Sequence, residues 1–123
     1  AGFSGCRCLA KNATVLASTC GSTLRSMPVM AYSPLAQAGR LRDGLLNHRV
    51  VTHIAKERGV SAAQILLAWV ISHPGVMAIP KAASVEHVAQ NAAALTLTLT
   101  AQERSQLDNA FPAPGKKVPL DMV

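Results

Sequence analysis

The chain has 123 residues, of which 50% are hydrophobic, and it carries a formal net charge of +6 at pH 7. This length supports one modest hydrophobic core, and no apolar run approaches the roughly 20 residues that span a bilayer. The basic residues are scattered, and one Trp, one Tyr and two Phe offer few rings for stacking on bases, so we expect neither a membrane nor a nucleic-acid partner.

Residues 1–27 differ from the rest of the chain. They hold all three cysteines and no acidic residue, and they show no helical or strand period. Three cysteines without a fourth ligand or a nearby histidine do not make a metal site. The segment also lacks the basic and apolar blocks of a signal peptide, so we expect a cytoplasmic protein. We interpret residues 1–27 as a segment foreign to the family of the rest of the chain, either disordered, read from a shifted frame or fused.

From residue 28 onward the pattern becomes that of an α/β protein. Residues 29–32 form an apolar run that predicts a buried strand, and residues 33–35 predict the turn that leaves its carboxyl end. We expect a long loop over residues 36–47. We interpret Arg40 and Arg42 in it as solvated charges, with a contact to a phosphate as the alternative.

Two helices should follow this loop. An apolar stripe over residues 50–55 predicts a helix that stops at Gly59. Ser61 and Gln64 have the spacing of a capping box, which predicts the start of a second helix. We expect Trp69 on this second helix to pack in the core.

The most informative stretch of the chain is residues 76–91. An apolar run over residues 76–79 predicts a short strand buried on both faces, which Pro80 ends because proline cannot donate to a sheet. Lys81 follows, and Ser84 is a good N-cap for a helix with an apolar stripe over residues 85–95. A lysine beside the positive end of a helix is suited to binding an anion. Farther on, residues 95–99 alternate in polarity and predict an extended, half-buried segment, and residues 100–103 predict the cap of a last helix.

Two of these stretches resemble cofactor-binding motifs of the aldo-keto reductases. The first is Tyr32-Ser33-Pro34-Leu35, which is similar to the strand-seven motif of that family. The second resembles the strand-eight motif and comprises Ile79-Pro80-Lys81, Ser84, Glu86, Gln90 and Asn91. The resemblance implies that residues 28–123 are the C-terminal part of a (β/α)8 TIM barrel, with strands seven and eight and their helices. A whole barrel of this kind needs about 250 residues.

The resemblance also implies a cofactor site, which we expect to hold NADPH. It places the Tyr32 ring against the nicotinamide, Ser33 and Leu35 along the pyrophosphate, Lys81 and Ser84 at the 2′-phosphate, and Gln90 and Asn91 near the adenine. The family usually has an arginine where this chain has His87. Losing that fixed charge weakens the preference for a 2′-phosphate, so NADH stays open as an alternative.

By resemblance, the reaction is hydride transfer from NADPH to small aldehydes such as methylglyoxal. The family's catalytic Asp, Tyr, Lys and His belong to the first half of the barrel, so we assign no catalytic residue here. We expect this chain alone to be inactive, since carbonyl reduction needs a proton donor. The alternative is a non-catalytic α/β remnant that self-associates to cover the edge of its sheet.

Overall fold

The computed structural model describes residues 29–36 and 40–112, and the statements that follow concern these residues. The elements run in the order β1 (Val29–Tyr32), α2 (Arg40–Leu46), α3 (Arg49–Arg58), α4 (Ala62–Ile71), β2 (Val76–Ile79), α5 (Val85–Ala93), the 3-10 helix η2 (Ala94–Thr96) and α6 (Ala101–Ala110). None of the described helices is both long and apolar enough to cross a bilayer. The segment 1–27 and the tail after residue 112 lie outside the described residues.

The two strands form a parallel pair, as the apolar runs predict. Val29 lies opposite Val76, and the register continues without a break to Tyr32 opposite Ile79. The chain crosses between the strands through α2, α3 and α4. Because both strands run in the same direction, their carboxyl ends meet at one end of the sheet, which is where α/β proteins place their binding residues.

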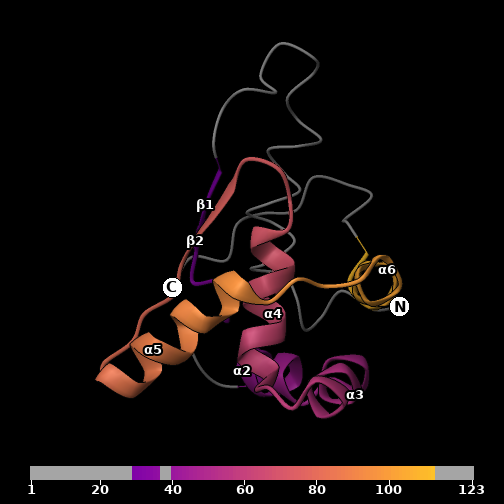
Figure 1. Cartoon of the computed structure of the whole chain (residues 1–123), viewed down its shortest axis with the longest axis horizontal. Coiled ribbons are helices and arrows are strands. Elements are labelled where there is room, and N and C mark those ends of the chain that lie inside the picture. The colour runs from indigo at the N-terminus through magenta and orange to yellow at the C-terminus, as the bar shows by residue number, and fades with distance from the viewer. Residues whose placement is uncertain (1–28, 37–39, 113–123) are drawn as a thin grey trace.

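The sheet is covered on one face, so the prediction of a strand buried on both faces is wrong. Along β2 the side chains alternate between half-buried and exposed, and Ala31 of β1 is buried. Such alternation is the pattern of a sheet with one packed face. The packed face lies toward α4, which contacts β2 directly (Figure 1).

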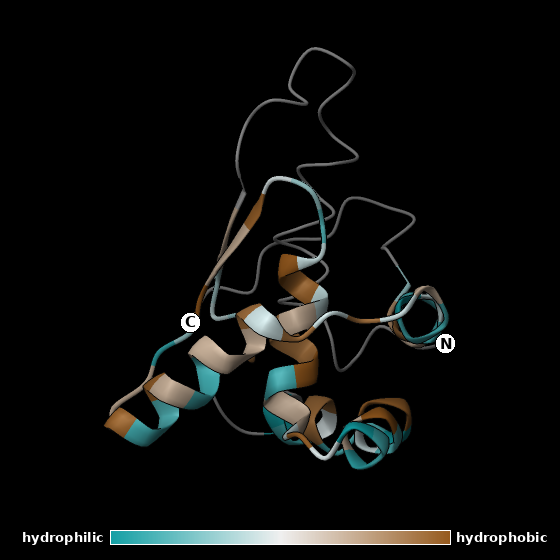
Figure 2. Ribbon diagram, viewed as in Figure 1, coloured by the Kyte–Doolittle hydropathy of each residue, from teal (hydrophilic) through white to brown (hydrophobic). Residues whose placement is uncertain are grey.

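The core is built around α4, which lies between the sheet on one side and α3 and α6 on the other (Figure 1). Every residue from Ile65 to Val70 is buried, so the helix is apolar around its whole circumference, and Figure 2 shows its brown turns at the centre of the molecule. Trp69 is 5% exposed, as expected for a core residue. Its indole Nε1 donates a hydrogen bond to Asp108 Oδ1 at 2.8 Å, which connects α4 to α6.

The ends of the helices follow the expected capping chemistry. Gly59 ends α3 in the left-handed conformation with φ 65°, which suits a residue without a Cβ. Ser61 and Gln64 form a complete capping box at the start of α4, and Thr100 and Glu103 form one at the start of α6. Each box satisfies amides that the helix itself leaves unpaired.

A bidentate ion pair joins α3 to α6. Arg58 donates from Nε to Glu103 Oε1 at 2.7 Å and from Nη2 to Oε2 at 2.6 Å. The hydrogen bonds from Arg58, together with those from Thr100, lower the pKa of Glu103 to about 2. The Glu103 carboxylate therefore serves both the interhelical pair and the capping box.

Residues 40–46 form a helix, so the prediction of a loop over 36–47 is wrong for this part. Leu45 is fully buried in the main core, whereas the polar Arg40, Arg42 and Asp43 face solvent. A single buried leucine among charged residues and a glycine leaves no clear helical spacing of apolar residues in the sequence. The helix is favoured by packing of α2 against α3, and such tertiary contacts often outweigh intrinsic propensity.

The apolar stripe expected on the helix after Ser84 is present, but it is not buried. Val85, Val88 and Leu95 are 87%, 54% and 74% exposed, and α5 contains no buried residue. Figure 1 shows α5 extending away from the other helices. The prediction of an extended segment over residues 95–99 is wrong for residues 95 and 96, which belong to η2. After η2, Leu97 is half-buried and Leu99 buried in a segment without helical structure, as the alternation predicts.

Candidate functional site

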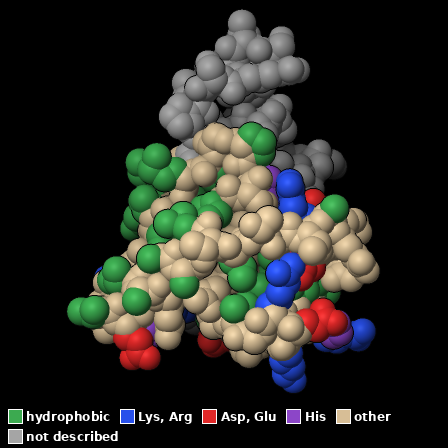
Figure 3. Space-filling view, viewed as in Figure 1, with side chains coloured by type: hydrophobic (Ala, Val, Ile, Leu, Met, Phe, Trp, Pro, Cys, Tyr) green, Lys and Arg blue, Asp and Glu red, His purple; other side chains and the backbone are tan. Residues whose placement is uncertain are grey.

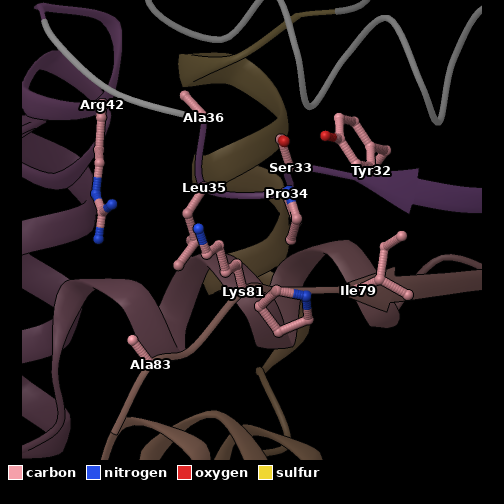
Figure 4. Close-up of a pocket in the computed structure, with 10 residues that line it drawn as sticks. Tyr32, Ser33, Pro34, Leu35, Ala36, Arg42, Ile79, Lys81 and Ala83 are labelled. Atoms are coloured by element: carbon pink, nitrogen blue, oxygen red, sulfur yellow. The ribbon is translucent and has the colours of Figure 1, made fainter.

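A pocket of about 600 Å³ opens at the carboxyl ends of the two strands. It is lined by Tyr32, Ser33, Pro34, Leu35, Ala36, Arg42, Ile79, Pro80, Lys81 and Ala83 (Figure 4). The lining thus comes from the end of β1 and the turn after it, from helix α2, and from the end of β2 and the loop after it. Only the parallel pairing of β1 with β2 brings the first and the last of these together.

The turn after β1 is held in an unusual backbone conformation. Ser33 and Ala36 have φ 51° and 59°, values that a residue with a Cβ adopts at a cost of about 1–3 kcal/mol. The Ala36 N–H donates to the Ser33 carbonyl at 2.9 Å, which closes the turn. Backbone strain of this kind concentrates at ligand sites, and here it shapes one wall of the pocket.

The pocket is cationic. Lys81 and Arg42 both line it, and none of the described residues of the lining is acidic. Figure 4 shows their charged ends toward one side of the pocket and the Tyr32 ring toward the other. One end therefore suits phosphate groups, and the other offers an aromatic face.

The N-terminus of α5 follows directly after the pocket. Ala83 lines the pocket, and the next residue, Ser84, caps the helix by accepting from the His87 N–H at 3.2 Å. The first turn of α5 thus begins beside the loop that carries Lys81. A helix start contributes unpaired N–H groups and a partial positive charge, which adds to the attraction for an anion.

The structure divides the predicted site residues into two groups. Tyr32, Ser33, Leu35 and Lys81 line one pocket together. The other four residues belong to α5 and its cap and lie outside the pocket lining: Ser84, His87, Gln90 and Asn91.

The backbone of α5 is anchored close to the start of α4. Gln64 Nε2 donates to the Gln90 carbonyl at 3.1 Å. This contact fixes one side of α5 while the side chains of His87 and Gln90 remain exposed. The exposed polar side chains of the helix are therefore available to a ligand that extends beyond the pocket.

Sequence reasoning favours a solvated loop charge for Arg42 and keeps a phosphate contact as the alternative. Arg42 is exposed, but it belongs to helix α2 and lines the pocket. Its only signal in sequence is a positive charge shortly after the first strand. Within the described residues, no group of three or more His, Cys, Asp or Glu side chains has an arrangement that holds a metal ion.

Comparisons with known proteins identify relatives of this chain. The model of the Aldo/keto reductase family matches residues 10–111. The Escherichia coli protein named methylglyoxal reductase YeaE is 65% identical over 99 residues, which cover 80% of this chain and 35% of the relative. An aldo/keto reductase of Synechocystis is 40% identical over 84 residues. The chain therefore spans about a third of the length of these curated relatives or less.

Solved structures give the same result. An aldo/keto reductase from Klebsiella pneumoniae in complex with NADP and acetate superposes with a TM-score of 0.79 at 56% identity, over 94% of this chain and 41% of that one. A second structure from Klebsiella pneumoniae, in complex with NADPH, has a TM-score of 0.78 at the same 56% identity. The family match begins at residue 10, inside the segment 1–27 that the sequence analysis interprets as foreign to the family. The chain belongs to the aldo/keto reductase family.

Proposed function

We propose that this chain forms the cofactor half of an NADPH-dependent reductase of the cytoplasm, which transfers a hydride to small aldehydes such as methylglyoxal. The observation that carries the proposal is the cationic pocket at the carboxyl ends of β1 and β2, where Tyr32, Ser33, Leu35 and Lys81 meet. The names of the E. coli and Klebsiella relatives support the substrate and the cofactor respectively.

The pocket chemistry fits a nicotinamide dinucleotide. Such a cofactor carries several negative charges, and the lining residues that the structure describes include the cations Arg42 and Lys81 and no acidic side chain. We assign the Tyr32 ring to the nicotinamide, and Ser33 and Leu35 to the pyrophosphate. When bound, the cofactor supplies the hydride, and these residues orient it.

The 2′-phosphate should distinguish the two cofactors. We assign it to Lys81, Ser84 and the first amides of α5, because the lysine and the helix N-terminus lie at neighbouring positions. We assign the remaining α5 positions, His87, Gln90 and Asn91, to the adenosine end. On this proposal NADPH binds more tightly than NADH.

Replacing Lys81 tests the proposal. A hydrogen bond to a charged group contributes about 1.5–3 kcal/mol, so Lys81→Ala should weaken NADPH binding roughly ten- to a hundred-fold and NADH binding little. The measurement is a calorimetric titration of both cofactors into the chain and the variant. Lys56→Ala is the matched control, because Lys56 is an exposed lysine of α3 outside the pocket.

Two results contradict the assignment. Equal losses for NADPH and NADH in Lys81→Ala mean that the lysine holds the fold or the pyrophosphate. Absence of binding of either cofactor to the unaltered chain means that the pocket is not a working cofactor site in this chain.

We further predict that the chain alone does not reduce aldehydes. Among the described residues of the pocket, Tyr32 and Lys81 can exchange a proton, and both are assigned to the cofactor, so we expect the developing alkoxide to lack a proton donor. Consumption of NADPH with methylglyoxal should equal that of a protein-free control. Turnover that follows the chain through purification would contradict the prediction.

The exposed face of the sheet favours a second candidate function. Met30 and Met77 are 59% and 52% exposed, so a non-catalytic α/β unit that self-associates through this face is the alternative. Sedimentation of the chain over a range of concentrations separates the two candidate functions, because binding of the cofactor at the pocket requires no dimer.

A further inference from the structure

A row of four rings connects the start of α3 with the end of α4; we call it the aromatic row, and it consists of His48, Phe111, Trp69 and His73. The His48 ring packs on Phe111 with the ring centroids 4.7 Å apart, and Phe111 packs on Trp69 at 5.6 Å. Trp69 and His73 meet edge to face, also at 5.6 Å. Phe111 and Trp69 are buried, whereas the two histidines are half-buried. Solvent protons can therefore reach both ends of the row.

His48 holds the start of α3 through an atom that protonation takes away. It is the N-cap of α3, and its Nδ1 accepts a hydrogen bond from the Val50 N–H at 3.3 Å. Because an N–H group only donates, Nδ1 carries a lone pair and the proton of the neutral ring lies on Nε2. A second proton would occupy Nδ1 and would place a positive charge at the helix N-terminus, where the dipole disfavours it. The weak attraction of the Phe111 ring for a cation does not replace the lost cap.

His73 makes the opposite kind of contact at the end of α4. Its Nδ1 lies 2.9 Å from the carbonyl oxygen of Trp69 and 3.3 Å from that of Val70. Because a carbonyl oxygen only accepts, Nδ1 of this ring carries the proton. A second proton binds Nε2 and leaves both contacts in place, and its charge is favourable at a helix C-terminus. Acid therefore removes the contact of His48 and strengthens that of His73.

The other charges near the row do not reverse this contrast. The charged and titratable side chains close to it in sequence are Asp43 on α2, Arg49 and His53 on α3, and Asp108 on α6. Among the described residues, none of these forms an ion pair or a side-chain hydrogen bond with His48 or His73. Figure 3 shows acidic and basic side chains close together over α3 and α6, so charges of both signs surround this region. Aspartate and arginine keep their charges where histidine titrates, so the response to mild acid comes from the histidines.

We propose that His48 and His73 make the two ends of the aromatic row respond to pH in opposite directions. At neutral pH, His48 caps α3, and its own N–H donates to the Leu45 carbonyl at the end of α2, the helix that carries Arg42. Over the range of about pH 8 to 5, in which histidines titrate, the junction of α2 with α3 loosens while the end of α4 becomes more stable. The device needs no cofactor, so it stands apart from the proposed function.

Two variants without a titrating ring test the proposal. His48→Asn keeps a side-chain oxygen that can cap α3, and His73→Asn removes the ring at the end of α4. Urea unfolding of the full chain and of each variant is followed by circular dichroism between pH 8 and pH 5. From pH 8 to pH 5, the folding equilibrium constant of the chain relative to His48→Asn should fall at least about twofold. Relative to His73→Asn, it should rise about 1.7- to fivefold.

His53→Asn is the matched control, because His53 is an exposed histidine of α3 outside the row. The chain should not lose stability relative to this control in acid, since the contact of His53 with Glu57 favours the protonated ring. A loss in acid relative to His53→Asn but not relative to His48→Asn assigns the response to His53 and overturns the proposal.

The tautomers can be measured without any variant, which decides the matter even where His48→Asn does not fold. In the 15N-labelled chain at pH 8, the ring nitrogen shifts should place the proton of His48 on Nε2 and that of His73 on Nδ1. The Val50 amide should move with the titration of His48. The same tautomer in both rings overturns the proposal, as does a stability relative to His48→Asn that stays constant or rises in acid.

Discussion

Helices α4 and α5 are of nearly equal length and both begin at a serine cap, yet they have opposite surroundings. Six consecutive residues of α4 are buried, whereas α5 buries none. Helix α4 packs between the sheet and α3, and it holds the core together. Helix α5 starts at the pocket and presents both polar and apolar side chains to solvent. A serine cap therefore starts both helices, but the surroundings decide that α4 stabilises the core and that α5 exposes its side chains to solvent.

The largest expected effect is the difference in free energy of unfolding between a side-chain truncation on α4 and one on α5. Leu66 of α4 is fully buried, so Leu66→Ala should lower the free energy of unfolding by about 2–5 kcal/mol. Val88 of α5 is 54% exposed, so Val88→Ala should change it by no more than about 0.5 kcal/mol. Denaturant unfolding monitored by Trp69 fluorescence measures both. Similar losses in the two variants would contradict the division between the helices.

The packed side of the molecule should also respond to acid. The Glu103 pKa is lowered from its ordinary value of 4.5 to about 2, first by the hydrogen bonds from Arg58. A carboxyl with a lowered pKa contributes stability above its unfolded pKa and loses that contribution as pH falls through its folded value. The pair between α3 and α6 should therefore weaken between about pH 4.5 and pH 2.

Glu103→Gln isolates this contribution from the other acidic groups. The unaltered chain should be more stable than the variant at pH 6, and the difference should shrink when unfolding is measured at pH 3 and below. A difference that stays constant over this range would show that the charge of Glu103 does not stabilise the contact between α3 and α6.

The smallest expected effect concerns α5 as a binding helix. The resemblance of residues 79–91 to the strand-eight motif implies an arginine at position 87, so on the proposed assignment His87→Arg should add a fixed charge near the 2′-phosphate. An exposed charge pair contributes about 0.2–1 kcal/mol, which corresponds to a gain in NADPH affinity of about 1.4- to five-fold with no gain for NADH. His53→Arg, at an exposed histidine of α3, is the matched control. A gain of equal size in the control would indicate a general effect of net charge.

Sequence reasoning recovered the local structure well. The bounds of β1 and β2 follow from short apolar runs, and those of α4 and α6 follow from capping boxes, because these signals act between residues that are close in the chain. It failed where the answer depends on distant partners. The helix α2 forms because Leu45 packs into the core, and the exposure of Val88 depends on what covers α5.

Prediction of the functional site from sequence has the same limit. Motifs in sequence identified Tyr32, Ser33, Leu35 and Lys81, which the fold brings into one pocket. Arg42 joined them only through the packing of α2, which no motif in its own segment reports. A charge that lines a pocket and a charge that faces solvent have the same appearance in a sequence, and their difference arises from the tertiary structure.

The central claim is that the nucleotide binds at the carboxyl ends of β1 and β2 and along the start of α5. Amide chemical shifts of the 15N-labelled chain, followed during addition of NADPH, test it most directly. We predict that the largest changes fall on Ser33, Leu35, Lys81 and the first turn of α5, and that NADH changes the α5 amides less. Shifts confined to α3 and α6, or a spectrum that NADPH leaves unchanged, would contradict the account.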